Sequence, residues 1–276
     1  MVPRWPSPTK ALRELSRGAR MVKVGGAGAG WRFLREEVLG NGWLRLTEGG
    51  GGDPESARVV CNLCGWAGSR FASHVAPGYL DKNAFCPRCK AYARHRGCAW
   101  LLAERLGDEL DAVATRGGRR LLFAPEAGLR NLLESRVGAL EGVDIDGGRA
   151  GVDIVADAQD LPLADGSVEL VVSFHVLEHV PDDARALAEI ARVLTPTGRL
   201  LLCAPMTFER EATQEFGEAR ADLNDHWREY GTDLRERLLA AGLDGPSYRF
   251  SHELPADEFR RLALVDEELF WVGRRA

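Results

Sequence analysis

Residues 157–205 read DAQDLPLADGSVELVVSFHVLEHVPDDARALAEIARVLTPTGRLLLCAP and carry the clearest fold signal in the chain. Val168–Phe174 and Arg199–Ala204 are nearly continuous apolar runs, which is the pattern of strands buried on both faces of a parallel sheet. Between them, Asp182–Leu194 has the apolar spacing of a helix. This stretch therefore predicts a strand, a helix and a second strand parallel to the first.

The same alternation of strand-length runs and helical patterns extends from residue 119 to the C-terminus. The further segments are Arg120–Ala124, Leu129–Val137, Gly142–Ile145, Asp153–Ala156, Leu234–Ala241, Ser247–Ser251 and Leu269–Gly273. They predict an α/β fold with a Rossmann-like, doubly wound, mostly parallel sheet of seven strands. Ser247–Ser251 and Leu269–Gly273 are the expected closing strands, for which an antiparallel direction is one option. Only about seven residues separate Ile145 from Asp153, too few for a crossover helix, so we expect a shortened loop and a degraded third strand there.

The chain has 276 residues, of which 45% are hydrophobic and 28% charged, with a formal net charge of −5. This composition is ordinary for a globular protein and excludes a largely disordered chain. No apolar run reaches the ~18 residues that a membrane-spanning helix needs. The first residues lack the apolar segment of a secretory signal. We therefore expect a cytoplasmic protein with no membrane partner, in which thiols stay reduced.

Four of the six cysteines form two pairs with the same C-x2-C spacing, Cys61-Asn62-Leu63-Cys64 and Cys86-Pro87-Arg88-Cys89. Each pair can bind one ion from a single tight turn, and two such pairs complete the tetrahedron that zinc accepts. Four protein ligands leave no open position, so we predict a structural zinc ion. Free thiols and an iron–sulfur site are the alternatives. Cys98 and Cys203 lie in apolar contexts and are predicted to pack in the core.

Charge is unevenly distributed along the chain. Residues 1–120 carry 20 basic and 11 acidic side chains, whereas residues 121–276 carry 16 and 30, which indicates two units with different surfaces. Gly25–Gly30 is glycine-rich and predicts a linker. Helices are expected near Ala11–Arg17, over Trp31–Leu39 and over Tyr92–Leu110. The predicted regions are a partly flexible N-terminal extension (1–57), a zinc-ribbon-like module (58–97), a linking helix (98–118) and the α/β domain (119–276).

The stretch 157–205 combines a DAxxLP turn, an acidic-apolar strand, the sequence HVLEH and a helix that leads into a P-x-G-x-L strand. In this combination it resembles the class I S-adenosylmethionine-dependent methyltransferases, in particular the type 11-like group, over residues ~119–276. The first motif departs from the family pattern, because Phe123-Ala124-Pro125-Glu126 stands where an acidic residue and a Gly-x-Gly loop are usual. A subset of methyltransferase-like proteins with an N-terminal zinc knuckle has this FAPE form.

The resemblance implies S-adenosylmethionine as the cofactor and places its ligands after the strands of the sheet. The implied cofactor-binding residues are Glu126, Gly128, Asp144, Asp157, Ala158 and His175. In the family, the position of Asp157 and Ala158 holds the adenine, and an acidic residue at the position of Asp144 binds the ribose; Asp146 is the competitor for that role. The alternatives for these acidic residues are a strand-end cap and a solvated turn.

Two histidines are candidate general bases, because the pKa of imidazole lies near neutral pH. His179 follows the fourth strand of the predicted sheet. His226 begins the sequence His-Trp-Arg-Glu-Tyr-Gly, which brings a base, a cation and a phenol close together. We predict His226, His179 and Tyr230 as catalytic residues; the alternative is that they are structural.

These features favour an enzyme that methylates oxygen or nitrogen of a small molecule, such as a secondary metabolite or a sugar. One alternative is an RNA methyltransferase, in which basic residues near the second cysteine pair contact phosphates. Those residues are Arg88, Lys90, Arg94 and Arg96. A second alternative is a non-catalytic, zinc-stapled binding protein. The sequence leaves the acceptor and the oligomeric state open.

Overall fold

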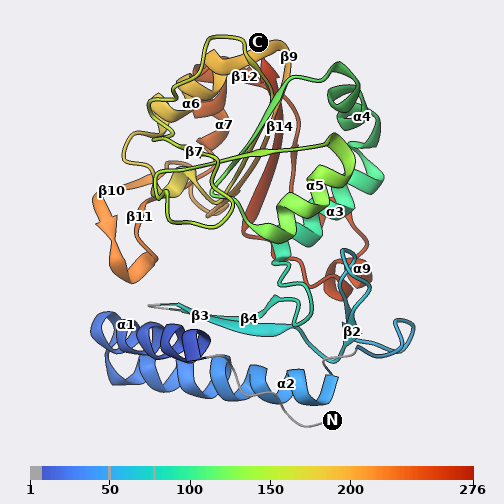
Figure 1. Ribbon diagram of the computed structural model, residues 1–276, viewed down its shortest axis with the longest axis vertical. Helices are drawn as coiled ribbons and strands as arrows, with labels where there is room; N and C mark the ends of the chain where they lie inside the picture. The colour runs from blue at the N-terminus through green and yellow to red at the C-terminus, as the bar shows by residue number, and fades with distance from the viewer. Residues whose placement is uncertain (1–7, 49–50, 77–78) are drawn as a thin grey trace. The chain divides into compact units, whose positions relative to one another are not determined.

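The structure, a computed structural model, describes residues 8–48, 51–76 and 79–276 and divides into two compact units (Figure 1). One unit takes in the chain up to Arg96 together with Arg220–Asp225 and Asp257–Leu264. The other contains Gly97–Ala219, His226–Ala256 and Val265–Ala276. No helix within the described residues is both long and apolar enough to cross a membrane.

The second unit is built around a mixed sheet with the strand order β12-β14-β9-β8-β5-β6-β7. The five strands β5 to β9 run parallel to one another, and β14 closes the sheet antiparallel to β9. The short β13 also pairs with β14, so the sheet has eight strands instead of the predicted seven. The strands are β5 (Arg119–Phe123), β6 (Glu141–Asp144), β7 (Ile154–Val155), β8 (Val168–Phe174), β9 (Leu194–Pro205), β12 (Leu243–Asp244), β13 (Ser247–Tyr248) and β14 (Glu268–Arg275).

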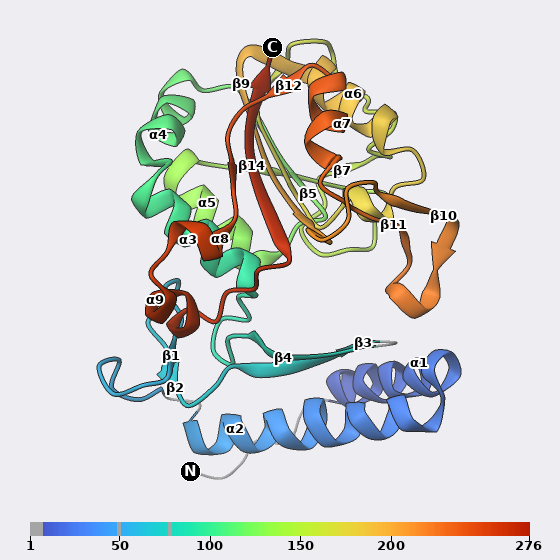
Figure 2. The same cartoon turned by 180° about the vertical axis from the view of Figure 1, so that it is seen from behind.

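Helices cover both faces of this sheet, as the apolar character of its central strands requires. Figures 1 and 2 show α3, α4 and α5 on one side and α6 and α7 on the other. In β8, six of the seven residues are buried. The predicted doubly wound, Rossmann-like fold is thus confirmed. The helices are α3 (Ala93–Glu104), α4 (Gly107–Arg116), α5 (Ala127–Val137), α6 (Asp183–Val193), α7 (Leu234–Ala240) and α8 (Phe250–Glu253). Helix α9 (Ala256–Arg261) belongs to the first unit except for its first residue.

The connection from β6 to β7 contains no helix, and β7 is only two residues long. It still pairs in parallel with β6, through Val143 opposite Ile154 and Asp144 opposite Val155. The predicted short loop and degraded third strand are both confirmed. A small two-stranded sheet of β10 (Gln214–Arg220) and β11 (His226–Glu229) follows β9.

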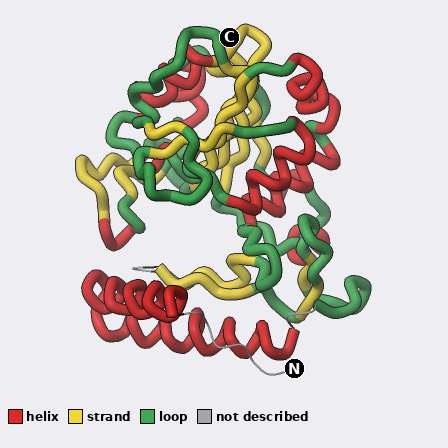
Figure 3. Tube along the Cα trace, viewed as in Figure 1, coloured by secondary structure: helices red, strands yellow, loops and turns green. Residues whose placement is uncertain are grey.

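The first unit begins with helix, where the sequence predicted a linker. Helix α1 (Pro8–Arg32) continues through a π-helical stretch, Phe33–Gly40, into α2 (Asn41–Glu48), and Figure 3 shows this region as helix. The linker prediction for residues 25–30 was wrong because tertiary packing outweighs the ~1 kcal/mol cost of each glycine. Ala29 and Phe33 pack with Met21 and Val75 in one buried cluster. The flexibility expected for residues 1–7 lies outside the described residues.

Two small antiparallel hairpins complete the first unit. They are formed by β1 (Val59–Val60) with β2 (Ala67–Gly68), and by β3 (Ala72–Ala76) with β4 (Tyr79–Phe85). The single helix predicted over Tyr92–Leu110 is two helices, because α3 ends at Glu104 and α4 begins at Gly107. The buried faces predicted for it are nonetheless present in both pieces, including Leu101 and Leu110.

Candidate functional site

The four paired cysteines meet in the first unit. One sulfur from each of Cys61, Cys64, Cys86 and Cys89 lies within 4.8 Å of the others. The Sγ–Sγ distances are 3.6 Å between Cys61 and Cys89 and 3.7 Å between Cys64 and Cys86. A tetrahedral zinc site with Zn–S bonds of ~2.3 Å separates its sulfurs by about 3.8 Å. The cluster therefore has the spacing that a zinc ion requires.

The backbone repeats the same turn around both cysteine pairs. The amide of Gly65 donates to the carbonyl of Cys61 at 2.8 Å, and the amide of Lys90 donates to Cys86 at 3.0 Å. Gly65 and Lys90 are both in the left-handed region, with φ of 69° and 66°. Such a turn directs both thiols of a pair toward one point. Cys98 and Cys203 are buried away from this cluster, as the sequence predicted.

The basic residues beside the second pair make contacts within the protein. Arg96 is fully buried and donates to the carbonyls of Leu262 and Ala91. The guanidinium of Arg94 lies 4.4 Å from the ring centroid of Tyr92. Lys90 Nζ donates to the carbonyl of Pro87, and Arg88 Nη1 to that of Cys64. These roles in holding the fold weaken the argument for a phosphate-binding patch.

In the second unit, the strand order changes direction between β5 and β8. The chain runs from β5 outward to β6 and β7, and then returns to β8 on the other side of β5. In open parallel sheets, ligands bind outside the carboxyl ends of the strands at such a switch point. Ala124 and His175, which follow β5 and β8, both have positive φ values, 47° and 54°. The chain therefore turns sharply at both strand ends.

The predicted acidic residues follow the strands at this same edge. Hydrogen bonds from Ala124 N to Val143 O (2.9 Å) and from Ala156 N to Asp144 O (3.1 Å) align the ends of β5, β6 and β7. Asp157 is the residue that follows Ala156 in the chain. The strand ends that carry Asp144 and Asp157 therefore lie at one edge of the sheet.

The two carboxylates have local partners. Asp144 Oδ1 accepts from the Asp146 amide, and Oδ2 pairs with Arg149 at 3.0 Å. Asp157 Oδ1 accepts from the backbone and side chain of Gln159, at 2.9 and 3.0 Å. Asp146 is exposed and accepts from the Gly148 amide. Asp144, which is the better buried of the two competing residues, is therefore the stronger ribose candidate.

Glu126 and Gly128 lie at the start of α5. Glu126 is the N-cap residue, in extended conformation, and its side chain makes no capping hydrogen bond. Gly128 lies in the first helical turn. The free amides of such a turn attract anionic groups, whereas a carboxylate at the N-cap attracts a cation. Both kinds of group occur at the amino-acid end of S-adenosylmethionine.

His175 is anchored by its backbone and by two acidic neighbours. Its amide donates to the carbonyl of Cys203 at 2.8 Å. Its ring nitrogens lie 3.1 Å from Glu268 Oε1 and 3.4 Å from Glu178 Oε1. Glu268 begins β14 beside the end of β9, opposite Pro205. No sequence spacing reveals this neighbour, because it depends on the antiparallel closing strand.

The two histidines predicted as bases lie together. The rings of His179 and His226 pack edge to face with centroids 4.7 Å apart. His179 Nε2 lies 3.9 Å from Glu178 Oε1, and one donor atom of each of the three residues lies within 4.8 Å of the others. Burial lowers the pKa of His226. Its imidazole is therefore neutral at neutral pH and able to accept a proton.

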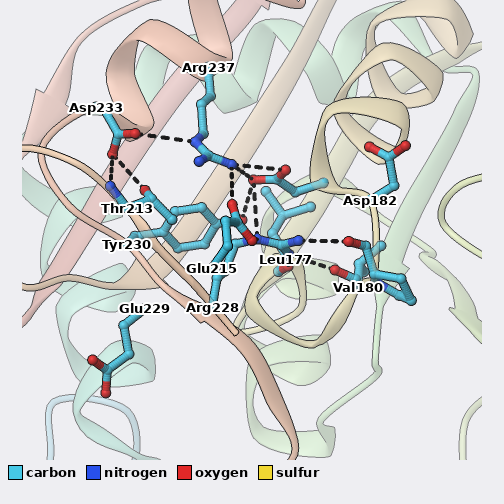
Figure 4. Close-up of polar contacts among 12 residues, drawn as sticks. Leu177, Val180, Asp182, Thr213, Glu215, Arg228, Glu229, Tyr230, Asp233 and Arg237 are labelled. Carbon is cyan, nitrogen blue, oxygen red and sulfur yellow. Dashed lines mark hydrogen bonds and ion pairs between the residues drawn. The ribbon is translucent and has the colours of Figure 1, made fainter. Parts of the chain in front are cut away.

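Tyr230, in contrast, is not placed to contact a substrate. It is fully buried, and its hydroxyl donates to Asp183 Oδ2 at 2.9 Å (Figure 4). Burial, together with the charge of Asp183, raises its pKa well above the ordinary value. The catalytic role predicted for Tyr230 is therefore withdrawn. Of the predicted base, cation and phenol, only His226 is partly exposed, whereas Arg228 and Tyr230 are buried.

Arg228 lies at the centre of the same buried network. Its guanidinium donates to the carbonyls of Leu177, Val180 and Pro181 and pairs with Glu215 at 3.0 Å. These bonds, drawn in Figure 4, connect β11 to the turn that carries Glu178 and His179. Arg228 is therefore a positioning residue, because its bonds hold the strand that carries His226 beside that turn.

Part of the chain is similar to known methyltransferases. Residues 131–202 match the family model described as a methyltransferase domain. The chain is 33% identical over 121 residues to the malonyl-[acyl-carrier protein] O-methyltransferase of Halorhodospira halophila, over 41% of this chain and 40% of that protein. It is 32% identical over 144 residues to the ubiquinone/menaquinone biosynthesis C-methyltransferase of Desulfotalea psychrophila, over 50% and 53%. The chain therefore spans about half or less of the length of these curated relatives.

Among solved structures, the chain is similar to the 1,6-didemethyltoxoflavin-N1-methyltransferase of Burkholderia thailandensis. The identity is 17% and the TM-score 0.43, over 66% of this chain and 83% of that one. The family match at 131–202 includes Asp144, Asp157 and His175, whereas Glu126 and the four cysteines lie outside it.

Proposed function

We propose that the protein is an S-adenosylmethionine-dependent methyltransferase that acts on oxygen or nitrogen of a small molecule. The observation that carries this proposal is the position of Asp144, Asp157 and His175, which follow strands at the switch point of the sheet and lie within the stretch that matches the methyltransferase domain. When bound, the cofactor would supply an electrophilic methyl group on its sulfonium sulfur.

Each residue of this edge has a role that suits its environment. Asp157 and the Ala158 amide would bind the adenine, and Asp144 would accept from the ribose hydroxyls. A ribose would share Asp144 with Arg149, whose side chain is 43% exposed, so this ion pair costs little to loosen. Glu126 would attract the ammonium of the cofactor, and the N-terminal amides of α5 its carboxylate.

The protein's own contribution to methyl transfer would be to orient the acceptor and to remove its proton. His226 and His179 are the candidates for the second task, because both are partly exposed and the burial of His226 keeps its imidazole neutral. Alignment of acceptor and methyl group accounts for much of the rate in such reactions.

We propose a structural zinc ion for the four-cysteine cluster. The sulfur spacing and the two equivalent turns support it, and four thiolates leave no position for a substrate. The ion would fix the fold around Trp66 and Phe71, which are buried in the same cluster.

The experiment that tests the proposed function is transfer of a labelled methyl group from S-adenosylmethionine. Purified, zinc-loaded protein is incubated with fractionated extract, in which molecules below ~1 kDa are separated from RNA. We expect label in the small-molecule fraction only. Label in RNA would favour the alternative acceptor, and the absence of label from every fraction would favour a binding protein without turnover.

A further inference from the structure

We propose that Glu178, His179 and His226 form a second metal site, for a divalent first-row transition-metal ion. The three residues come from the turn after β8 and from β11, both in the second unit. The four-cysteine cluster lies in the other unit, so the two sites do not share ligands.

The geometry brings one carboxylate and two imidazoles to a common point. A carboxylate oxygen of Glu178 and one ring nitrogen from each histidine lie within 4.8 Å of one another. Metal–nitrogen and metal–oxygen bonds of ~2.1 Å place neighbouring ligands about 3.0–3.4 Å apart. Small rotations of the two partly exposed imidazole rings would bring them to this spacing, and Glu178 need not move.

The carboxylate of Glu178 lacks the hydrogen bonds that such burial normally requires. Its side chain is 1% exposed, and within the described residues neither oxygen accepts a hydrogen bond. Burial of an ionised carboxylate without a compensating charge or hydrogen bond strongly destabilises the folded protein. A cation bound between Glu178 and the two histidines would provide that compensation.

The donor set suits a transition metal. Two neutral imidazoles and one carboxylate form the arrangement that binds iron, zinc or manganese with open coordination positions. His179 keeps 35% of its side chain exposed, so solvent can reach the site.

Donation from His175 is the competing explanation for the buried carboxylate. Its Nδ1 lies 3.4 Å from Glu178, and its Nε2 lies 3.1 Å from Glu268. A neutral ring carries one proton and can donate to only one of these carboxylates, whereas an imidazolium can donate to both. If His175 compensates the carboxylate of Glu178 in this way, no metal ion is required. The metal explanation predicts that the protein binds Mn2+ at this site, and the His175 explanation predicts that it does not.

If the proposed function holds, the ion would act on the acceptor. Its open positions would bind a hydroxyl of the acceptor and lower the pKa of that hydroxyl, so that its proton passes to solvent water instead of to a free histidine base. The resulting oxygen would bond to the methyl carbon as the bond from that carbon to the sulfonium sulfur breaks, which leaves S-adenosylhomocysteine. An acceptor with two neighbouring oxygens, such as a vicinal diol or a catechol, could occupy two positions. This step depends on the proposed function, whereas the metal site itself does not.

The test is titration of zinc-loaded protein with Mn2+, followed by electron paramagnetic resonance of the free ion. Zinc is added at one equivalent per chain, which the four thiolates take up in preference to the second site, so that this site stays open for manganese. We expect one Mn2+ bound per chain, with at least tenfold weaker binding in Glu178→Gln and in His226→Gln. His252→Gln, in the unrelated helix α8, is the matched control and should bind as the unmodified protein does.

Two results would overturn the site. One is unmodified protein that leaves the signal of free Mn2+ unchanged at millimolar concentration. The other is equal binding by all three variants, which would place the ion elsewhere. If circular dichroism shows that Glu178→Gln does not fold, Mn2+ binding is compared between the unmodified protein and His226→Gln alone, since His226 is only half-buried. Methyl transfer is not measured in this experiment, so failure of the proposed function does not affect its outcome.

Discussion

Arg228 Nη1 donates to the carbonyl oxygen of Leu177 at 2.8 Å and thereby ties strand β11 to the turn after β8. The side chain of Arg228 is 2% exposed, and it also donates to the carbonyls of Val180 and Pro181 and to the carboxylate of Glu215. This one cation therefore sets the position of His226 relative to Glu178 and His179.

Replacement Arg228→Met should lower the free energy of unfolding by about 3 kcal/mol or more, because three buried carbonyls lose their donor. Urea unfolding of the folded protein measures this change. The matched control is Arg119→Gln, since Arg119 pairs with Glu141 in a half-exposed position, where an ion pair contributes ~0–1 kcal/mol. Equal losses of unfolding free energy in the two variants would show that Arg228 does not hold β11 to the turn after β8.

Tyr230→Phe should cost about 1–2 kcal/mol of stability and leave the turnover of the folded protein nearly unchanged. The substitution removes only the hydrogen bond to Asp183, which still pairs with Arg237 at 3.0 Å. Unfolding in urea and initial rates of methyl transfer are measured on the same preparation. A large loss of rate at unchanged stability would restore the catalytic role that the structure argues against.

The sequence predicted this fold well because its central strands are buried on both faces and therefore read as continuous apolar runs. The short connection between Ile145 and Asp153 also predicted the lost helix, since chain length alone limits what can cross a sheet. The glycine-rich residues 25–30 were misread, because packing of Ala29 and Phe33 against Val75 depends on a hairpin more than 30 residues further along.

The candidate site could be predicted only where its residues follow strands. The ends of parallel strands meet at one edge, which predicted the neighbourhood of Asp144 and Asp157. Partners that come from the closing strand or from α6 could not be predicted. Glu268 beside His175 and Asp183 beside Tyr230 are two examples, because their positions depend on tertiary packing.

Substitution Cys61→Ser should remove zinc from the protein and unfold the segment that includes Trp66 and Phe71. The free energy of metal binding to a four-thiolate site contributes directly to folding of the segment that carries it. Metal analysis of the purified protein and limited proteolysis give the two readouts. Cys98→Ser, a buried cysteine outside the cluster, should retain one zinc per chain. Absence of zinc from the unmodified protein would refute the site.

His74 should make stability fall as the solution becomes acidic. Burial, followed by the charges of Arg17 and Arg94, lowers its pKa to about 4. Between about pH 6.5 and pH 4 the unfolded chain binds a proton that the folded protein does not, so the free energy of unfolding rises with pH in this window, by up to about 3 kcal/mol. His74→Gln should flatten this dependence in urea titrations at several pH values. An unchanged slope would show that other groups cause it.

Calorimetric titration of zinc-loaded protein with S-adenosylhomocysteine tests the central claim most directly. We predict one binding site per chain, weakened about tenfold or more in Asp157→Ala, because a hydrogen bond to a charged group is lost. Asp165→Ala, at an exposed position, should bind as the unmodified protein does. A folded, zinc-loaded protein that takes up no S-adenosylhomocysteine would contradict the account.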